Sequence, residues 1–251
     1  MLDVLKSDFY RLCRMKSFYV LSLLAVIERV FPAVLLGLMV PQRGNHTVAE
    51  FLEGFQGHFL ISSIFCVLFI VEEFRSRRVL VILSSGISRV DFLLSKAILS
   101  CCFYFYLSIL SKIVIVVTCS FFLKFGTFTN IIYFSLLEEI LLGIVWILFS
   151  STIAVLFRST GLSLTFVFFS NIAIPAVFAG ANSILRAYFS SYFSKDFNLS
   201  NFWFRAAFNG LYDRPENEVY SCLYTGILVS VVWLCFFLFC YFWSFTKRDV
   251  K

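Results

Sequence analysis

The chain has 251 residues, of which 60% are hydrophobic and only 14% are charged. A soluble domain carries about 25% charged and about 45–50% apolar residues, so the surface of this chain would be too apolar for water. The formal net charge is +6, but the basic residues stand at the ends of apolar stretches. This pattern indicates membrane topology and argues against a nucleic-acid-binding surface.

We therefore interpret residues 1–251 as one all-α, polytopic transmembrane domain. Residues 1–16 predict an amphipathic helix that lies in the membrane interface, because apolar residues recur there at spacings of three and four with charged residues between them. The apolar positions of this stripe are Leu2, Leu5, Phe9 and Leu12.

Six apolar stretches follow, and each is expected to be a transmembrane helix because backbone polar groups must be paired within lipid. Most reach the ~20 residues that a spanning helix needs, whereas the second is short. Pro32 and Pro175 lie inside two of the stretches and predict local bends. The six are Ser17–Val40, Gly57–Val71, Ser95–Phe122, Ile131–Phe157, Leu162–Ala179 and Ser221–Phe245.

The distribution of lysine and arginine predicts the orientation, since these residues accumulate in short cytoplasmic loops. With both termini in the cytoplasm, thirteen of the 21 basic residues lie inside. The inner loops are then a long one at 72–92 and a minimal one at 158–161. The last outer segment, 180–220, is rich in aromatic residues, and we expect short helices that form a re-entrant hairpin there.

The loop at 72–92 has the pattern of a helical elbow. A charged turn leads into an apolar run, and Gly86 can end a helix in a left-handed conformation. Ser88 and Asp91 fit a capping box that starts the next helix. Such a loop has two interpretations: a positive segment that only fixes topology, or a docking surface for a cytoplasmic partner.

Three features resemble the membrane subunits of type-2 ATP-binding cassette (ABC) exporters, including peptide-antibiotic exporters and lantibiotic immunity permeases. They are the N-terminal interfacial helix, the segment EEFRSRRVLVILSSGISRVDFLLSK from Glu72 to Lys96, and the basic-Asp-basic ending FTKRDVK from Phe245 to Lys251. The six-span layout and the hairpin before the last span fit this family as well.

The resemblance implies that 72–92 is a coupling loop that contacts a separate ATPase subunit. Its contact residues would be Glu72, Glu73, Arg75, Arg77, Arg78, Leu83, Gly86, Ser88 and Arg89. The chain carries no G-x-x-x-x-G-K-[ST] motif, so ATP and Mg would be bound by the partner. The transporter would contain two permease chains, identical or paralogous, in the cell membrane.

The expected function is ATP-driven export of an amphipathic or hydrophobic, peptide-like substrate by alternating access, with a role in antibiotic resistance or immunity. The permease itself would be no enzyme and would bind no cofactor. The alternative is a secondary transporter driven by an ion gradient, although paired broken helices are not evident in the sequence.

Five charged residues fall within the predicted spans, where each costs about 2.5–3.5 kcal/mol. They are Glu28, Arg29, Lys112, Glu138 and Glu139. From the rise of about 1.5 Å per residue, Lys112 lies at a depth where it can pair with Glu138 or Glu139. The charges either join helices or line a substrate or proton path. No cysteine and histidine spacing indicates a metal site.

Overall fold

The computed structural model describes residues 2–39, 58–121, 130–189 and 216–246, and these ranges are helical with no strand. The helices are α1 (Leu2–Leu12), α2 (Lys16–Met39), α4 (His58–Arg75), α5 (Arg78–Ser84), α6 (Arg89–Ser120), α7 (Asn130–Phe157), α8 (Thr160–Phe189) and α9 (Glu216–Thr246). The all-α prediction is confirmed for these residues.

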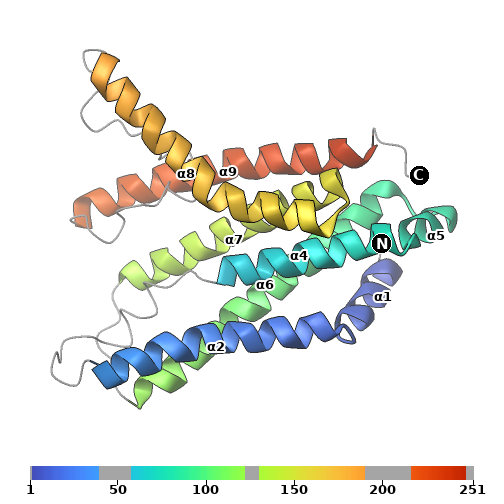
Figure 1. Cartoon of the computed structure of the whole chain (residues 1–251), viewed down its shortest axis with the longest axis horizontal. Helices are drawn as coiled ribbons and strands as arrows, with labels where there is room; N and C mark the ends of the chain where they lie inside the picture. Colours follow the sequence, from blue (N-terminus) through green and yellow to red (C-terminus); the bar gives the residue numbers. More distant parts are fainter. Residues whose placement is uncertain (1, 40–57, 122–129, 190–215, 247–251) are drawn as a thin grey trace.

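The long helices run side by side as an elongated bundle (Figure 1). Helices α4, α6 and α7 form its centre; α9 packs on α7, while α1 and α2 pack on α6. We call the end with α1, α5 and the last turn of α9 the terminal end. Helix α8 contacts α7 and α4 near its start and then diverges from the bundle.

Two apolar clusters hold the bundle together. The larger joins α4, α6, α7 and α9 around buried side chains such as Cys66, Tyr104 and Phe149, and the smaller joins α1, α2, α4 and α6 around Phe65 and Phe103. In the smaller cluster the rings of Phe65 and Phe103 stack with their centroids 3.8 Å apart. Helices α4 and α6 contribute to both clusters and therefore connect them.

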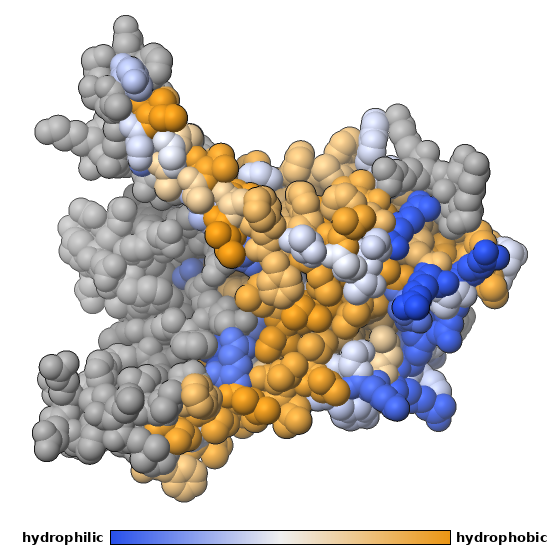
Figure 2. All heavy atoms as spheres, viewed as in Figure 1, coloured by the Kyte–Doolittle hydropathy of each residue, from blue (hydrophilic) through white to orange (hydrophobic). Residues whose placement is uncertain are grey.

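Within the described ranges, four helices are long and apolar enough to cross a membrane: Arg89–Ser120, Leu136–Phe157, Thr160–Leu185 and Tyr224–Phe245. Their outward faces carry exposed apolar side chains, including Phe169, Ile172 and Phe239. Figure 2 shows an apolar surface along the bundle, with most of the strongly hydrophilic residues of this face at the terminal end. Exposed apolar area on this scale supports a membrane location.

The first two predicted spans are helical but have weaker features. Helix α4 has 18 residues and ends in the charged turn from Glu72 to Arg75, so its apolar part is shorter than the ~20 residues of a span. Helix α2 is continuous, but its apolar sequence is interrupted by the charged residues Glu28 and Arg29. The structure therefore supports four spans, while six remain a prediction.

Several helices extend beyond the apolar stretches predicted for them. Helix α6 begins at Arg89, before the stretch expected from Ser95, and this start agrees with the predicted capping box because Ser88 is the N-cap. Helix α4 ends at Arg75 and α9 begins at Glu216. Helix α8 continues to Phe189, so the first part of the expected 180–220 hairpin prolongs a span instead. Residues 190–215 lie outside the described residues. Helix α8 changes direction along its length (Figure 1), and Pro175 within it removes one backbone hydrogen bond.

Helix α1 packs on α6 with a different face from the predicted stripe. Val4, Asp8 and Leu12 are buried, whereas Phe9 is 56% exposed. Phe9 and its exposed neighbour Tyr10 thus face outward together. The predicted helix is present, but one buried face includes a carboxylate, which the hydrophobic pattern did not indicate.

Candidate functional site

A buried charge network joins three helices at the terminal end. The ammonium group of Lys96 on α6 lies 2.7 Å from Glu73 Oε1 on α4 and 2.6 Å from Asp8 Oδ1 on α1. Arg11 on α1 forms a further ion pair with Glu73 Oε1. The side chains of Lys96 and Glu73 are fully buried. We call Asp8, Arg11, Glu73 and Lys96 the terminal-end network.

Further polar and aromatic contacts surround this network. Ser95 Oγ donates to Asp8 Oδ2 at 3.2 Å, and the Lys96 ammonium lies 4.7 Å from the ring centroid of Phe69. The Arg11 guanidinium lies 5.3 Å from the same ring. Buried ions need such partners, because each has given up its hydration shell.

The predicted elbow is present next to this network. Gly86 has φ 87°, the left-handed conformation expected for it. Ser88 is the N-cap of α6, and its Oγ accepts a hydrogen bond from the amide of Asp91 at 3.0 Å. Arg89 donates to the carbonyl of Phe245 at 3.4 Å, so the elbow also contacts the end of α9.

The predicted coupling residues divide by exposure. Glu72, Arg75, Arg77, Arg78, Gly86 and Ser88 are exposed, whereas Leu83 and Arg89 are half-buried. Glu73 is fully buried, because it pairs with Lys96 and Arg11 inside the bundle. It therefore offers no surface to a partner, and its role is to hold α4 against α6 and α1. The exposed apolar residues of the elbow are Leu80, Val81 and Val90.

A second buried network lies at the opposite end of the bundle. His58 on α4 stands between two charges: its Nδ1 is 3.0 Å from an Arg29 guanidinium nitrogen, and its Nε2 is 3.0 Å from Glu139 Oε1. Lys112 on α6 forms an ion pair with Glu139 Oε2. The predicted contact between Lys112 and an acid of the neighbouring span is thus present. We call Arg29, His58, Lys112 and Glu139 the opposite-end network.

The donors determine the tautomer of His58. A guanidinium only donates hydrogen bonds, so Nδ1 must accept, and the proton then lies on Nε2, which faces the carboxylate. Ser108 Oγ also donates to Glu139 Oε1, at 2.8 Å. Glu139 therefore has partners from α4 and α6, and this arrangement favours the interhelical role over an isolated, proton-carrying acid.

The other two predicted intramembrane charges, Glu138 and Glu28, are neighbours in sequence of two members of this network. Glu138 is buried at 4% exposure, next to Glu139 on α7. Glu28 is half-buried, and its Oε2 has no hydrogen-bond partner among the described residues. In the part of the chain that the structure describes, no group of three histidine, cysteine or acidic side chains could hold a metal ion.

The sequence did not single out Asp8, Arg11 or His58 as members of a site. Asp8 is separated from Lys96 by 88 positions, so only the fold brings the two together. One signal was available: Asp8 follows Val4 and precedes Leu12 at steps of four, which places it on one helical face with both. His58 stands at the start of the predicted span Gly57–Val71, and nothing nearby in the sequence indicates its partners Arg29 and Glu139.

No known family model matches the chain, and a comparison with curated proteins likewise finds no relative.

Proposed function

We propose that this chain is the transmembrane subunit of an ATP-driven exporter of the type-2 ABC kind, and that it moves an amphipathic or hydrophobic, peptide-like substrate. Its six spans would be α2, α4, α6, α7, α8 and α9, with both termini in the cytoplasm. ATP and Mg would be bound by a separate ATPase. A second permease chain would complete the transporter in the bacterial cytoplasmic membrane.

The observation that carries this proposal is the exposed elbow and its attachment to the bundle. Val81 on α5 is 69% exposed, while the residues on either side of α5 are tied to the helices behind it. Within the elbow, Glu73 precedes α5 and pairs with Lys96, and Arg89 follows α5 and contacts the end of α9. A displacement of α5 by a partner would therefore be passed to α4, α6 and α9 together.

Helix α8 supports the proposed pairing with a second permease. Only 17% of the most apolar 18-residue stretch of α8 is buried inside the bundle, compared with 72% of the corresponding stretch of α7. Its exposed side chains include Phe169, Ile172 and Val177. Such a face is suited to lipid or to another membrane helix, since neither requires polar groups.

The test is to purify the tagged chain from its native membrane and to assay the preparation for ATP hydrolysis. We expect an ATPase to co-purify and its turnover to fall at least tenfold with Val81→Asp, because a charge would enter the apolar contact. Val81→Thr keeps the shape of the side chain and should retain most of the turnover. Absence of any ATPase from the preparation would overturn the proposal.

The rival function is a secondary transporter driven by an ion gradient. Its candidate relay would be the buried pair of His58 and Glu139, although the further contacts of Glu139 with α6 favour an interhelical role for that pair. Proton-coupled carriers use such titratable groups inside the membrane. In vesicles with ATP inside and the ion gradients collapsed by an ionophore, the exporter would continue to move its substrate. Transport that stops with the gradient would favour the rival.

A further inference from the structure

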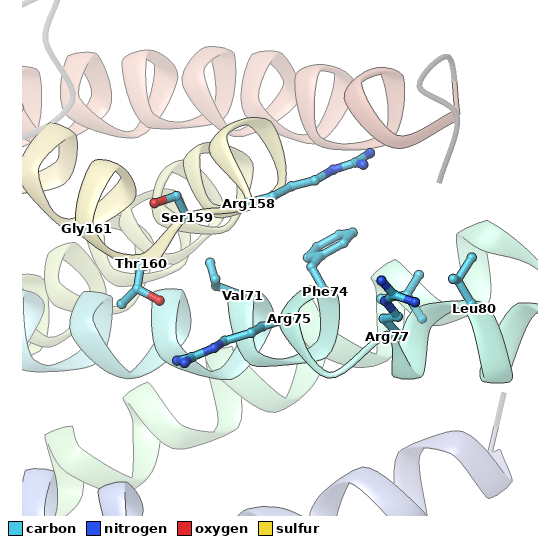
Figure 3. Close-up of a pocket in the computed structure, with 10 residues that line it drawn as sticks. Val71, Phe74, Arg75, Arg77, Leu80, Arg158, Ser159, Thr160 and Gly161 are labelled. Atoms are coloured by element: carbon cyan, nitrogen blue, oxygen red, sulfur yellow. The ribbon is translucent and has the colours of Figure 1, made fainter. Parts of the chain in front are cut away.

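A cavity of about 490 Å³ lies at the terminal end, behind the elbow. One wall comes from the end of α4 and from α5; the other comes from the turn between α7 and α8 (Figure 3). Its volume is within the range of about 300–1,000 Å³ that is typical of small-molecule sites. We call this cavity the arginine pocket.

Three arginines line the pocket. Arg75 and Arg77 belong to the wall formed by α4 and α5, and Arg158 belongs to the turn between α7 and α8, with Phe74 between them in Figure 3. The Arg158 guanidinium lies 5.1 Å from the ring centroid of Phe74, which fixes its position on the apolar side of the cavity. No acidic residue is among the described residues that line the pocket. Three cations in one cavity attract an anion.

The remaining polar groups of the pocket suit an oxyanion. Ser159 and Thr160 contribute hydroxyls at the point where α8 begins. The amides of the first turn of a helix lack intrahelical acceptors and carry partial positive charge, so they add to the arginines. Arginine presents its donors in a fork that matches phosphate oxygens.

Exposed apolar residues in and beside the pocket favour a lipid over a free phosphate as its ligand. Leu80 lines the pocket and is 39% exposed, and the α7–α8 turn is flanked by Phe157 and Leu162, which are 40% and 61% exposed. Because α7 and α8 are apolar enough to span the membrane, these side chains lie where acyl chains meet headgroups. A soluble anion would gain nothing from them.

We propose that the arginine pocket binds the phosphate group of an anionic phospholipid, whose acyl chains lie along the exposed apolar residues of the α7–α8 turn. Basic pockets at a membrane surface recognise such headgroups. A bound lipid would connect the elbow to the α7–α8 turn through one shared anion. This inference does not rest on the exporter proposal, because it requires only that the chain spans a membrane.

The test measures lipid binding to the purified full chain in detergent, by native mass spectrometry and by the shift in thermal unfolding. The probes are phosphatidylglycerol, phosphatidylcholine, inorganic phosphate and glycerol 3-phosphate. We expect phosphatidylglycerol to bind at least tenfold more tightly than the other three, because only it combines an anionic phosphate with acyl chains.

The variants separate the pocket from general charge attraction. Arg75→Gln combined with Arg77→Gln should weaken phosphatidylglycerol binding at least tenfold. The matched control, Lys6→Gln combined with Arg78→Gln, removes the same charge from exposed residues at the same end and should change the affinity less than twofold. If the double variant does not fold, Arg158→Gln alone is used, with an expected loss of at least fivefold.

Three results would overturn the proposal. Equal losses in the pocket variant and the control would show attraction to the whole basic surface. Binding of inorganic phosphate as tight as that of phosphatidylglycerol would assign the pocket to a free anion. Unchanged lipid affinity in the pocket variant, together with loss of a co-purifying protein, would assign the arginines to a protein partner.

Discussion

Replacement of Lys96 by methionine tests the energetic role of the terminal-end network. Methionine fills much of the same volume, but it would leave Asp8 without its cationic partner and Glu73 with Arg11 alone, and these two carboxylate side chains are only 6% and 0% exposed. Removal of one partner from a buried ion pair costs about 3–5 kcal/mol. For a chain of this size, about 2–4 °C is lost per kcal/mol, so we expect the unfolding temperature to fall by about 6–20 °C.

The measurement is thermal unfolding in detergent, followed by tryptophan fluorescence and by size-exclusion chromatography of heated samples. A second variant removes the stranded charges as well, by adding Glu73→Gln and Asp8→Asn to Lys96→Met. Neutral groups cost less to bury than unpaired ions, so we expect it to recover at least half of the loss. A single variant that unfolds within 2 °C of the wild type, or a triple variant no more stable than the single, would refute the reasoning.

Three further predictions use other contacts and the same unfolding assay. Gly143→Ala should lower the free energy of unfolding by about 1–3 kcal/mol, because the added Cβ would overlap the ring of Tyr104. Adding Tyr104→Leu should restore part of this stability, and the absence of any restoration would contradict the assigned clash. Glu139→Gln should lower the free energy of unfolding by about 3–5 kcal/mol, because it removes the carboxylate that pairs with Lys112 and contacts His58. Glu28→Gln should lower it by less than about 1 kcal/mol, and similar losses in the two variants would contradict the opposite-end network. Ser88→Ala should cost about 0.5–2 kcal/mol by removing the N-cap of α6, with faster amide exchange in its first turn, while Ser88→Thr keeps the hydroxyl and should exchange like the wild type.

Local features of the fold could be predicted because neighbouring residues determine them. Gly86 and Ser88 specify the elbow through backbone freedom and capping, and both behave as expected. The contact between Lys112 and Glu139 followed from helical rise alone, because depth in a membrane reduces the search to one dimension. The elbow could be inferred from neighbouring residues, and the ion pair from the depths of two residues along their helices.

Contacts that depend on helix rotation could not be predicted in the same way. The family resemblance placed Glu73 among the residues that would contact a partner, whereas the structure buries Glu73 against Lys96. Hydropathy gives the depth of a residue but not the neighbour that it faces. The face of α1 that packs on α6 was not predicted either, because the apolar stripe indicated the side expected to meet the membrane and not the side that includes the buried Asp8. The rotation of each helix about its own axis depends on packing partners that are distant in the sequence, and the periodicity of one segment does not identify them.

The attachment of α9 has a consequence for biogenesis. Tyr241 donates to the carbonyl of Leu93 at 3.1 Å, and its ring is fully buried beside residues synthesised much earlier. A nascent chain emerging from the ribosome would present the surface of α7 that packs against α9 to lipid until α9 enters the membrane. Docking of α9 would therefore be a separate step that follows insertion of α6 and α7, and a chain interrupted before α9 would be a natural substrate for quality-control proteases.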